Sequence, residues 1–159
     1  GRLYSRQVAE AAHLVADSLG VDDYDLVWQS RSGPPRVPWL EPDIVDHLDA
    51  LHERGVTAVI VVPVGFISDH LEVVWDLDTE ARDRAAELGM EFVRAATAGT
   101  DPRFAQMVRE LVQERVGTAS PRRRGTEPEF GTGCNGTLCA VRCCEPPARP
   151  SRPAPTAED

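Results

Sequence analysis

Apolar positions in the first part of the chain follow two different periods. Between residues 5 and 19 they recur every three or four positions, which predicts an amphipathic helix that ends at Gly20. Residues 57–62 form a continuous apolar and β-branched run instead, which predicts a strand covered on both faces. The two periods in one short chain indicate a domain that mixes helices and strands.

Weaker patterns fill the spaces between these two elements. A β-prone run covers residues 24–29, and a second helix is expected between Pro42, where a helix can begin, and Gly55, where it can end. A third helix is expected over residues 69–88, followed by a short strand over residues 91–94.

A last helix is expected after Asp101, because aspartate is a good N-cap and the next residue, Pro102, fits the first helical position. Helices and strands in alternation predict an α/β fold, with a small parallel sheet of three strands flanked by helices. We assign residues 1–116 to this domain.

The sequence changes character after Val116. Seven of the 13 prolines lie there, with three consecutive arginines and an end rich in Ala, Pro and Ser. This composition buries too little apolar surface to order itself, so we expect a linker over residues 117–133 and a disordered tail over residues 146–159. Between them, residues 134–145 hold all four cysteines, and this irregular segment is expected to be structured only around a metal.

Charge and hydropathy exclude some classes of partner. The chain carries no lysine, and through Val116 there are 11 arginines against 21 acidic residues. An acidic domain argues against nucleic acid as partner and fits a protein that handles small molecules or cations. No apolar run is long enough for a transmembrane segment, and the first residues lack a signal-peptide core, so we expect a cytoplasmic protein.

The candidate chemistry lies after the strand at residues 57–62, where ligands bind in open α/β sheets. Asp69, His70 and Glu72 fall within four residues at the start of a helix. Asp69 and Glu72 also have the spacing of a capping box, so both could serve only to satisfy helix-end amides. His70 could be a hydrogen-bonded, partly buried histidine. The spacing locates a site without identifying its reaction.

Longer motifs carry a resemblance to a family. Trp28-Gln29-Ser30-Arg31-Ser32-Gly33, Pro38-Trp39-Leu40-Glu41-Pro42 and the Val-Pro-Val-Gly-Phe-Ile-Ser-Asp-His-Leu-Glu-Val run at residues 62–73 resemble the C-terminal half of ferrochelatases, which insert Fe²⁺ into porphyrins. Trp75-Asp76-Leu77-Asp78 and Arg94-Ala95 extend the match in order. The resemblance covers residues 1–116 and implies one of two Rossmann-like halves that close over a porphyrin.

The resemblance also implies roles for individual residues. Glu72 corresponds to the acid that accepts pyrrole protons or ligates the incoming iron, which a carboxylate can do because it supplies both oxygen ligation and basicity. Asp69 and His70 would orient Glu72 and tune its basicity. The resemblance also implies that Trp39, Phe66 and Ser68 bind the porphyrin. Trp39 could alternatively be a loop aromatic that covers the core.

One part of the family pattern is missing from this chain. The family's metal-facing histidine belongs to the opposite half, and none of His13, His47 or His52 stands in the corresponding motif. We therefore expect the chain to be a fragment whose partner is the missing N-terminal half. Alone, it is expected to bind porphyrin poorly and to insert iron weakly or not at all.

Cys134, Cys139, Cys143 and Cys144 stand where many ferrochelatases carry a C-terminal [2Fe-2S] cluster. The resemblance thus implies this cofactor, with structural zinc and unligated or disulfide-forming thiols as alternatives, since thiolates suit iron–sulfur clusters and zinc alike.

The sequence leaves three functional hypotheses. The first is a ferrochelatase region acting on coproporphyrin III or protoporphyrin IX, with coproporphyrin III favoured by the cysteine tail. The second is a non-catalytic remnant that binds porphyrin or an iron–sulfur cluster. The third is a chelatase for a precorrin-type ring with cobalt or nickel, against which the Trp-Gln-Ser and Pro-Trp-Leu segments argue.

Overall fold

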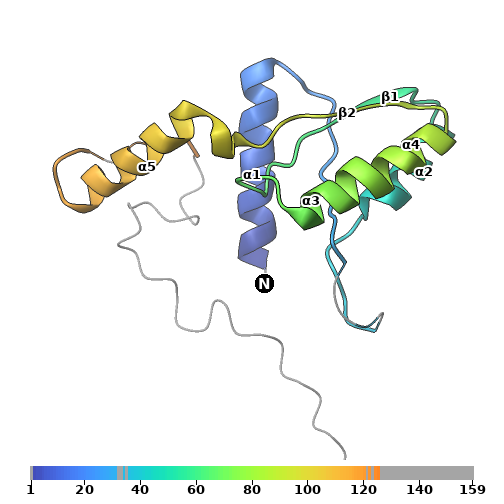
Figure 1. Cartoon of the computed structure of the whole chain (residues 1–159), viewed down its shortest axis with the longest axis horizontal. Helices are drawn as coiled ribbons and strands as arrows, with labels where there is room; N and C mark the ends of the chain where they lie inside the picture. The colour runs from blue at the N-terminus through green and yellow to red at the C-terminus, as the bar shows by residue number, and fades with distance from the viewer. Residues whose placement is uncertain (1, 32–33, 35, 121, 123, 126–159) are drawn as a thin grey trace, which may run out of the picture.

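A computed structural model of the 159-residue chain describes residues 2–31, 34, 36–120, 122 and 124–125. Figure 1 shows their arrangement. The elements follow one another in the order α1 (Arg2–Leu19), α2 (Ile44–Glu53), β1 (Ala58–Val61), α3 (Leu71–Trp75), the π-helical segment η1 (Asp76–Ala81), α4 (Arg82–Glu87), β2 (Glu91–Arg94), the 3₁₀ turn η2 (Ala98–Thr100) and α5 (Pro102–Arg115).

The two strands form a parallel sheet. Ala58 of β1 lies opposite Glu91 of β2, and the register runs to Val61 opposite Arg94. The connection between them contains one continuous helix over residues 71–87, made of α3, η1 and α4. This confirms the predicted α/β architecture, in which a small parallel sheet is flanked by helices.

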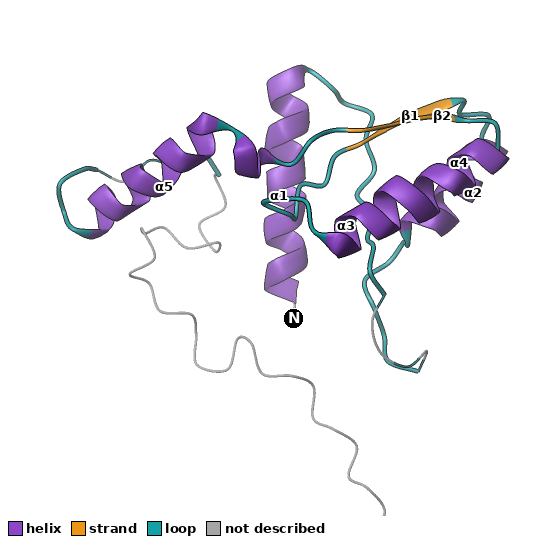
Figure 2. Ribbon diagram, in the orientation of Figure 1, coloured by secondary structure: helices purple, strands orange, loops and turns teal. Residues whose placement is uncertain are grey.

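Only one face of the sheet is covered by the described residues. Figure 2 shows α2 and the helix over residues 71–87 on the same side of the strands. Val59 and Phe92 point to this side and pack against the core. Ile60 and Val93 point to the other side, where they are 75% and 58% exposed. The prediction of a strand covered on both faces is therefore wrong for the described chain, because both packing helices lie on one side.

The predicted strand at residues 24–29 is also wrong. Within the described chain, Trp28 makes a single parallel bridge to Asp43. The Trp28 N–H donates to the Pro42 carbonyl, and the Ile44 N–H donates to the Trp28 carbonyl, at 2.9 and 2.8 Å. Both bonds go to the segment that enters α2, so this run pairs with a helix entry instead of a strand.

The start of α2 lies slightly later than the sequence indicated. Its N-cap is Asp43, whose side chain accepts a hydrogen bond from the Val45 N–H at 2.8 Å, so Pro42 precedes the helix and is not its first residue. A carboxylate acceptor at this position satisfies a backbone donor that has no partner inside the helix.

The outer helices agree with the sequence. α1 ends before Gly20, whose φ of 67° lies in the left-handed region that glycine adopts without strain. The N-cap of α5 is Asp101, which accepts a hydrogen bond from the Arg103 N–H at 2.8 Å, with Pro102 as the first helical residue. None of the described helices combines the length and the apolar composition needed to cross a bilayer.

The core forms between α2 and the helix over residues 71–87. Four core residues on this helix repeat at intervals of four positions, and Val73, Leu77, Ala81 and Ala85 are each at most 1% exposed. In a regular α-helix, each step of four residues rotates the side chain by about 40°. The wider turn of the π-helical segment reverses part of this rotation and keeps the four side chains facing α2.

Candidate functional site

Residues 62–70 leave the carboxyl end of β1 in a tight path. The Val64 N–H donates to the Val62 carbonyl at 2.8 Å, and the Phe66 N–H donates to the Pro63 carbonyl at 3.1 Å. Because β1 and β2 are parallel, β2 ends at the same edge of the sheet. The predicted site residues therefore begin at the edge where open α/β sheets bind ligands.

Glu72 stands in the first turn of α3 and is exposed. The N-cap of this helix is His70, and no side chain provides a capping hydrogen bond. The alternative in which Asp69 and Glu72 form a capping box is therefore wrong. Among the described residues nothing forms a hydrogen bond or an ion pair with the Glu72 carboxylate, so its oxygens are available to a ligand.

Glu72 opens a row of three carboxylates. Asp76 and Glu80 follow it at intervals of four residues, next to the buried stripe of the same helix. A row of like charges on one side of a helix creates a negative potential that attracts cations. An open hollow beside its first part is lined by His70, Leu71, Glu72, Trp75 and Asp76. In the part of the chain that the structure describes, no three His, Cys, Asp or Glu side chains converge to hold a metal ion.

Asp69 is held by Arg94, the last residue of β2. The Arg94 guanidinium donates to both Asp69 oxygens at 3.0 and 3.3 Å, and to both Asp78 oxygens at 2.6 and 2.8 Å. Hydrogen bonds from Arg94 lower the pKa of Asp78, and the same bonds raise the pKa of Arg94. The arginine thus fastens the loop before α3 to the π-helical segment behind it.

His70 packs against Phe66. Their ring centroids lie 5.1 Å apart at an interplanar angle of 65°, an edge-to-face contact. Phe66 in turn packs against the core. Among the described residues, Asp69 forms its hydrogen bonds with Arg94, and neither His70 nor Asp69 is hydrogen-bonded to the Glu72 carboxylate.

Ser68 lies close to Gly99 of η2. A Cβ atom added to Gly99 would stand 2.6 Å from the Ile67 carbonyl oxygen and 3.0 Å from the Ser68 Cβ. Only glycine permits this approach, which holds the loop before α3 against the segment that follows β2.

Trp39 is 39% exposed and is not among the residues packed on the core. Its indole N–H donates to the Gln29 carbonyl at 3.3 Å.

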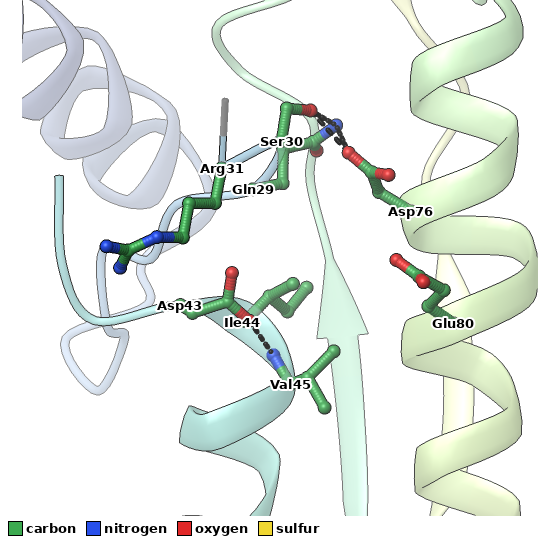
Figure 3. A pocket seen from close by; sticks show the side chains of 8 residues that line it. All are labelled: Gln29, Ser30, Arg31, Asp43, Ile44, Val45, Asp76 and Glu80. Carbon is green, nitrogen blue, oxygen red and sulfur yellow. Dashed lines mark hydrogen bonds between the residues drawn. The ribbon is translucent and has the colours of Figure 1, made fainter. Parts of the chain in front are cut away.

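Two interactions at the site were missed by the sequence analysis. Arg94 was quoted only as part of a matching motif, and its partners lie 16 and 25 positions away, beyond the reach of any local pattern. The second is the attachment of Asp76 to the segment that precedes Trp39 (Figure 3), where the Ser30 hydroxyl and the Gln29 amide donate to one Asp76 oxygen. Cys134, Cys139, Cys143 and Cys144 lie outside the described residues.

Comparison with known proteins identifies close relatives. The family model for ferrochelatase matches residues 1–116. The coproporphyrin III ferrochelatase of Nocardia farcinica is 64% identical over 151 residues, which are 95% of this chain and 43% of the relative. Those of Mycobacteroides abscessus and Corynebacterium diphtheriae are 59% and 53% identical, over 89% and 94% of this chain and 43% and 41% of the relatives. The chain thus spans less than half the length of the curated relatives it matches.

Proposed function

The chain belongs to the ferrochelatase family, and from this premise we propose that it supplies the Glu72 side of a site that inserts Fe²⁺ into a porphyrin. The observation that carries the proposal is the position of Glu72. Its carboxylate stands unpaired among the described residues, in a hollow at the carboxyl edge of the sheet, at the head of an acidic row.

Insertion requires an acceptor for protons as well as a path for the metal. Fe²⁺ enters the ring as two pyrrole N–H protons leave, so the charge of the ring and metal together falls by two. Glu72 accepts these protons one at a time and passes them to water. Its oxygens, followed by those of Asp76 and Glu80, attract the dication toward the ring. Asp69 and His70 support this role by fixing the backbone that carries Glu72.

Three residues are proposed to contact the ring itself. Trp39 offers a partly exposed indole face. Phe66 lies in the loop over residues 62–70, where its ring packs against His70. Ser68 offers an exposed hydroxyl in this loop. Aromatic faces and a few polar groups are the usual lining of a site for a large planar ligand.

The ring substrate is proposed to be coproporphyrin III in preference to protoporphyrin IX. The three relatives named above are coproporphyrin III ferrochelatases. A comparison of kcat/KM for the two rings tests the choice, and a higher value for protoporphyrin IX would reject it.

The cytoplasmic location stays a prediction, which fractionation of the source cells can check.

Activity is proposed to need the remainder of the longer protein, as the proposed partner of this chain. A suitable test protein is a chimera in which residues 1–159 are joined to the unmatched remainder of the Nocardia farcinica relative. The chimera is expected to insert Fe²⁺ into coproporphyrin III. If it binds the porphyrin without inserting iron, the second hypothesis, a non-catalytic porphyrin-binding remnant, takes the place of the first.

The role of Glu72 is tested by Glu72→Gln in the chimera. The amide is nearly isosteric but accepts no proton at neutral pH, so kcat should fall by about 100-fold or more. Glu53→Gln is the matched control, because Glu53 is an exposed glutamate at the end of α2. Near-normal turnover by Glu72→Gln would remove the central assignment.

The cysteines are proposed to hold a [2Fe-2S] cluster. Four thiols within 11 residues supply the number and type of ligand that the cluster takes. After anaerobic purification we expect a brown protein with visible absorbance and a rhombic EPR signal on reduction, both lost in Cys139→Ser. A colourless protein with one equivalent of zinc would favour the structural-zinc alternative.

A further inference from the structure

Asp76 contributes to the lining of two hollows on the surface of the described chain. It is one helical turn beyond Glu72 and helps to line the hollow in which Glu72 stands. On its other side is a pocket of about 180 Å³, shown in Figure 3. Gln29, Ser30 and Asp76 are among the residues that line this pocket.

Two donors from the segment before Trp39 converge on a single oxygen of Asp76. The Ser30 hydroxyl donates a hydrogen bond to Asp76 Oδ2, and the Gln29 side-chain amide donates to the same atom at 3.4 Å. The carbonyl of Gln29 also accepts the hydrogen bond from the Trp39 indole N–H. A continuous set of hydrogen bonds therefore leads from Trp39 through Gln29 to the helix that carries Glu72.

The backbone of Ser30 is adapted to this contact. Its φ of 63° makes it the one non-glycine residue with a positive φ in the described chain. A serine in the left-handed region is strained, and such strain persists only where surrounding contacts hold it. The Ser30 hydroxyl donates to Asp76, which is 46 positions away in the sequence, and accepts a hydrogen bond from the neighbouring Gln29 side-chain amide at 3.3 Å.

We propose that Asp76 is a positioning residue. Through its hydrogen bonds with Ser30 and Gln29, it holds Trp39 at a fixed position relative to Glu72. The proposal rests on the proposed function, in which Trp39 contacts the porphyrin and Glu72 faces the metal. A ring placed by one wall must present its centre to the carboxylate on the other, and small errors in such placement lower rates steeply. Asp76 fixes the relative position of the two through one carboxylate oxygen.

The position of Trp39 can be measured directly in the 159-residue chain. In a ¹⁵N-labelled sample, the Trp39 indole N–H resonance is assigned with Trp39→Phe. Ser30→Gly keeps the left-handed backbone accessible but removes the hydroxyl, and Asp76→Ala removes the acceptor. In both variants the Trp39 resonance should shift and its heteronuclear NOE should fall. Asp83→Ala, at an exposed acid further along the same helix, should leave both unchanged.

Rescue by a conservative variant separates the hydrogen bond from general damage to the fold. Asparagine tolerates the left-handed region and its amide can donate to Asp76, so Ser30→Asn should restore the Trp39 signal that Ser30→Gly loses. Circular dichroism confirms that each variant is folded. An unchanged Trp39 signal in Ser30→Gly and Asp76→Ala would overturn the proposal.

Kinetics in the chimera distinguish positioning from chemistry. Ser30→Gly should raise the KM for coproporphyrin III by about tenfold with a smaller change in kcat, because it loosens a wall of the ring site. Glu72→Gln should instead lower kcat with a smaller change in the KM for coproporphyrin III. A fall in kcat at constant KM for Ser30→Gly would contradict the positioning role. The NMR result decides the attachment of Trp39 even if the parent chimera is inactive, so failure of the proposed function remains distinguishable.

Discussion

Gly99 and the backbone of Ile67 approach so closely that a single methyl group would not fit between them. In Gly99→Ala the new Cβ would stand 2.6 Å from the Ile67 carbonyl oxygen, and backbone atoms cannot move aside cheaply. We expect a loss of about 1–3 kcal/mol in the free energy of unfolding, typical of overpacking. In the chimera kcat should fall too, because the displaced loop leads into the first turn of α3, which carries Glu72.

Gly65→Ala is the matched control for this substitution. A Cβ at Gly65 meets the Tyr4 hydroxyl at 3.7 Å, which is an ordinary contact. Urea denaturation of the two variants gives the comparison. Equal stabilities would show that the approach of Gly99 to Ile67 does not constrain the loop.

The ion pair between Arg94 and Asp78 makes stability depend on pH in a predictable direction. Their side chains are 12% and 17% exposed, and hydrogen bonds from Arg94 lower the pKa of Asp78 in the folded state. A carboxyl with a lowered folded pKa stabilises the fold above its unfolded pKa, about 4, and loses this contribution as pH falls through the folded pKa. Asp78→Asn should therefore cost about 1.5–3 kcal/mol near neutral pH and progressively less below about pH 4.

Chemical denaturation at a series of pH values checks this prediction. Asp83→Asn controls for the loss of one acidic charge on the same helix, because Asp83 is exposed. A stability difference between the parent chain and Asp78→Asn that stays constant down to about pH 3 would contradict the assigned role of Arg94.

For single residues, the sequence predicts the secondary-structure element in which a residue lies better than it predicts the residues that it contacts. The Asp69-His70-Leu71-Glu72 run could be assigned to a helix start after a strand because strand and helix signals are local. The partner of Asp69 could not, since Arg94 reaches it only after β2 has paired with β1. The capping-box spacing was misleading for the same reason: the carboxylate that could have capped the helix is held by an arginine from another strand.

The helix over residues 71–87 carries the site on one side and the core on another. Leu77 lies within its π-helical segment and is 1% exposed, between α2 and the sheet. Leu77→Ala should cost about 2–5 kcal/mol, because the cavity it leaves is only partly filled by relaxation. Leu71→Ala, at a leucine that is 83% exposed on the same helix, should change stability by less than about 0.5 kcal/mol. Thermal denaturation of the two variants tests this contrast, and equal losses would contradict the packing.

Elements with strong local signals could be predicted, and those that depend on long-range pairing could not. α1 and α5 have apolar periodicity with a glycine or Asp-Pro boundary, and β2 was placed at residues 91–94, where it is observed. The run at residues 24–29 has the composition of a strand but finds only the entry of α2 as its partner. The π-helical segment was predicted as ordinary helix, because apolar residues at intervals of four positions are also typical of an α-helix.

At the scale of the whole molecule, three observations support the proposal that the described chain supplies one side of a larger site. Ile60 and Val93 form an exposed apolar face on the sheet, whereas strands of parallel sheets are usually covered on both faces. The chain spans 43% of the Nocardia farcinica relative. Among the described residues, no three His, Cys, Asp or Glu side chains converge near Glu72 to hold a metal ion.

These features lead to a prediction about the isolated chain. Residues 1–159 alone should insert Fe²⁺ into coproporphyrin III at least about 100-fold more slowly than the chimera, because the ring then lacks the proposed opposite wall that would hold it against Glu72. Iron insertion is followed by the change in the porphyrin spectrum under anaerobic conditions, with equal concentrations of the two proteins. The chimera with Glu72→Gln sets the rate expected without the carboxylate. Turnover by the isolated chain close to that of the chimera would mean that one half of the site is sufficient and that Glu72 needs no partner across the ring.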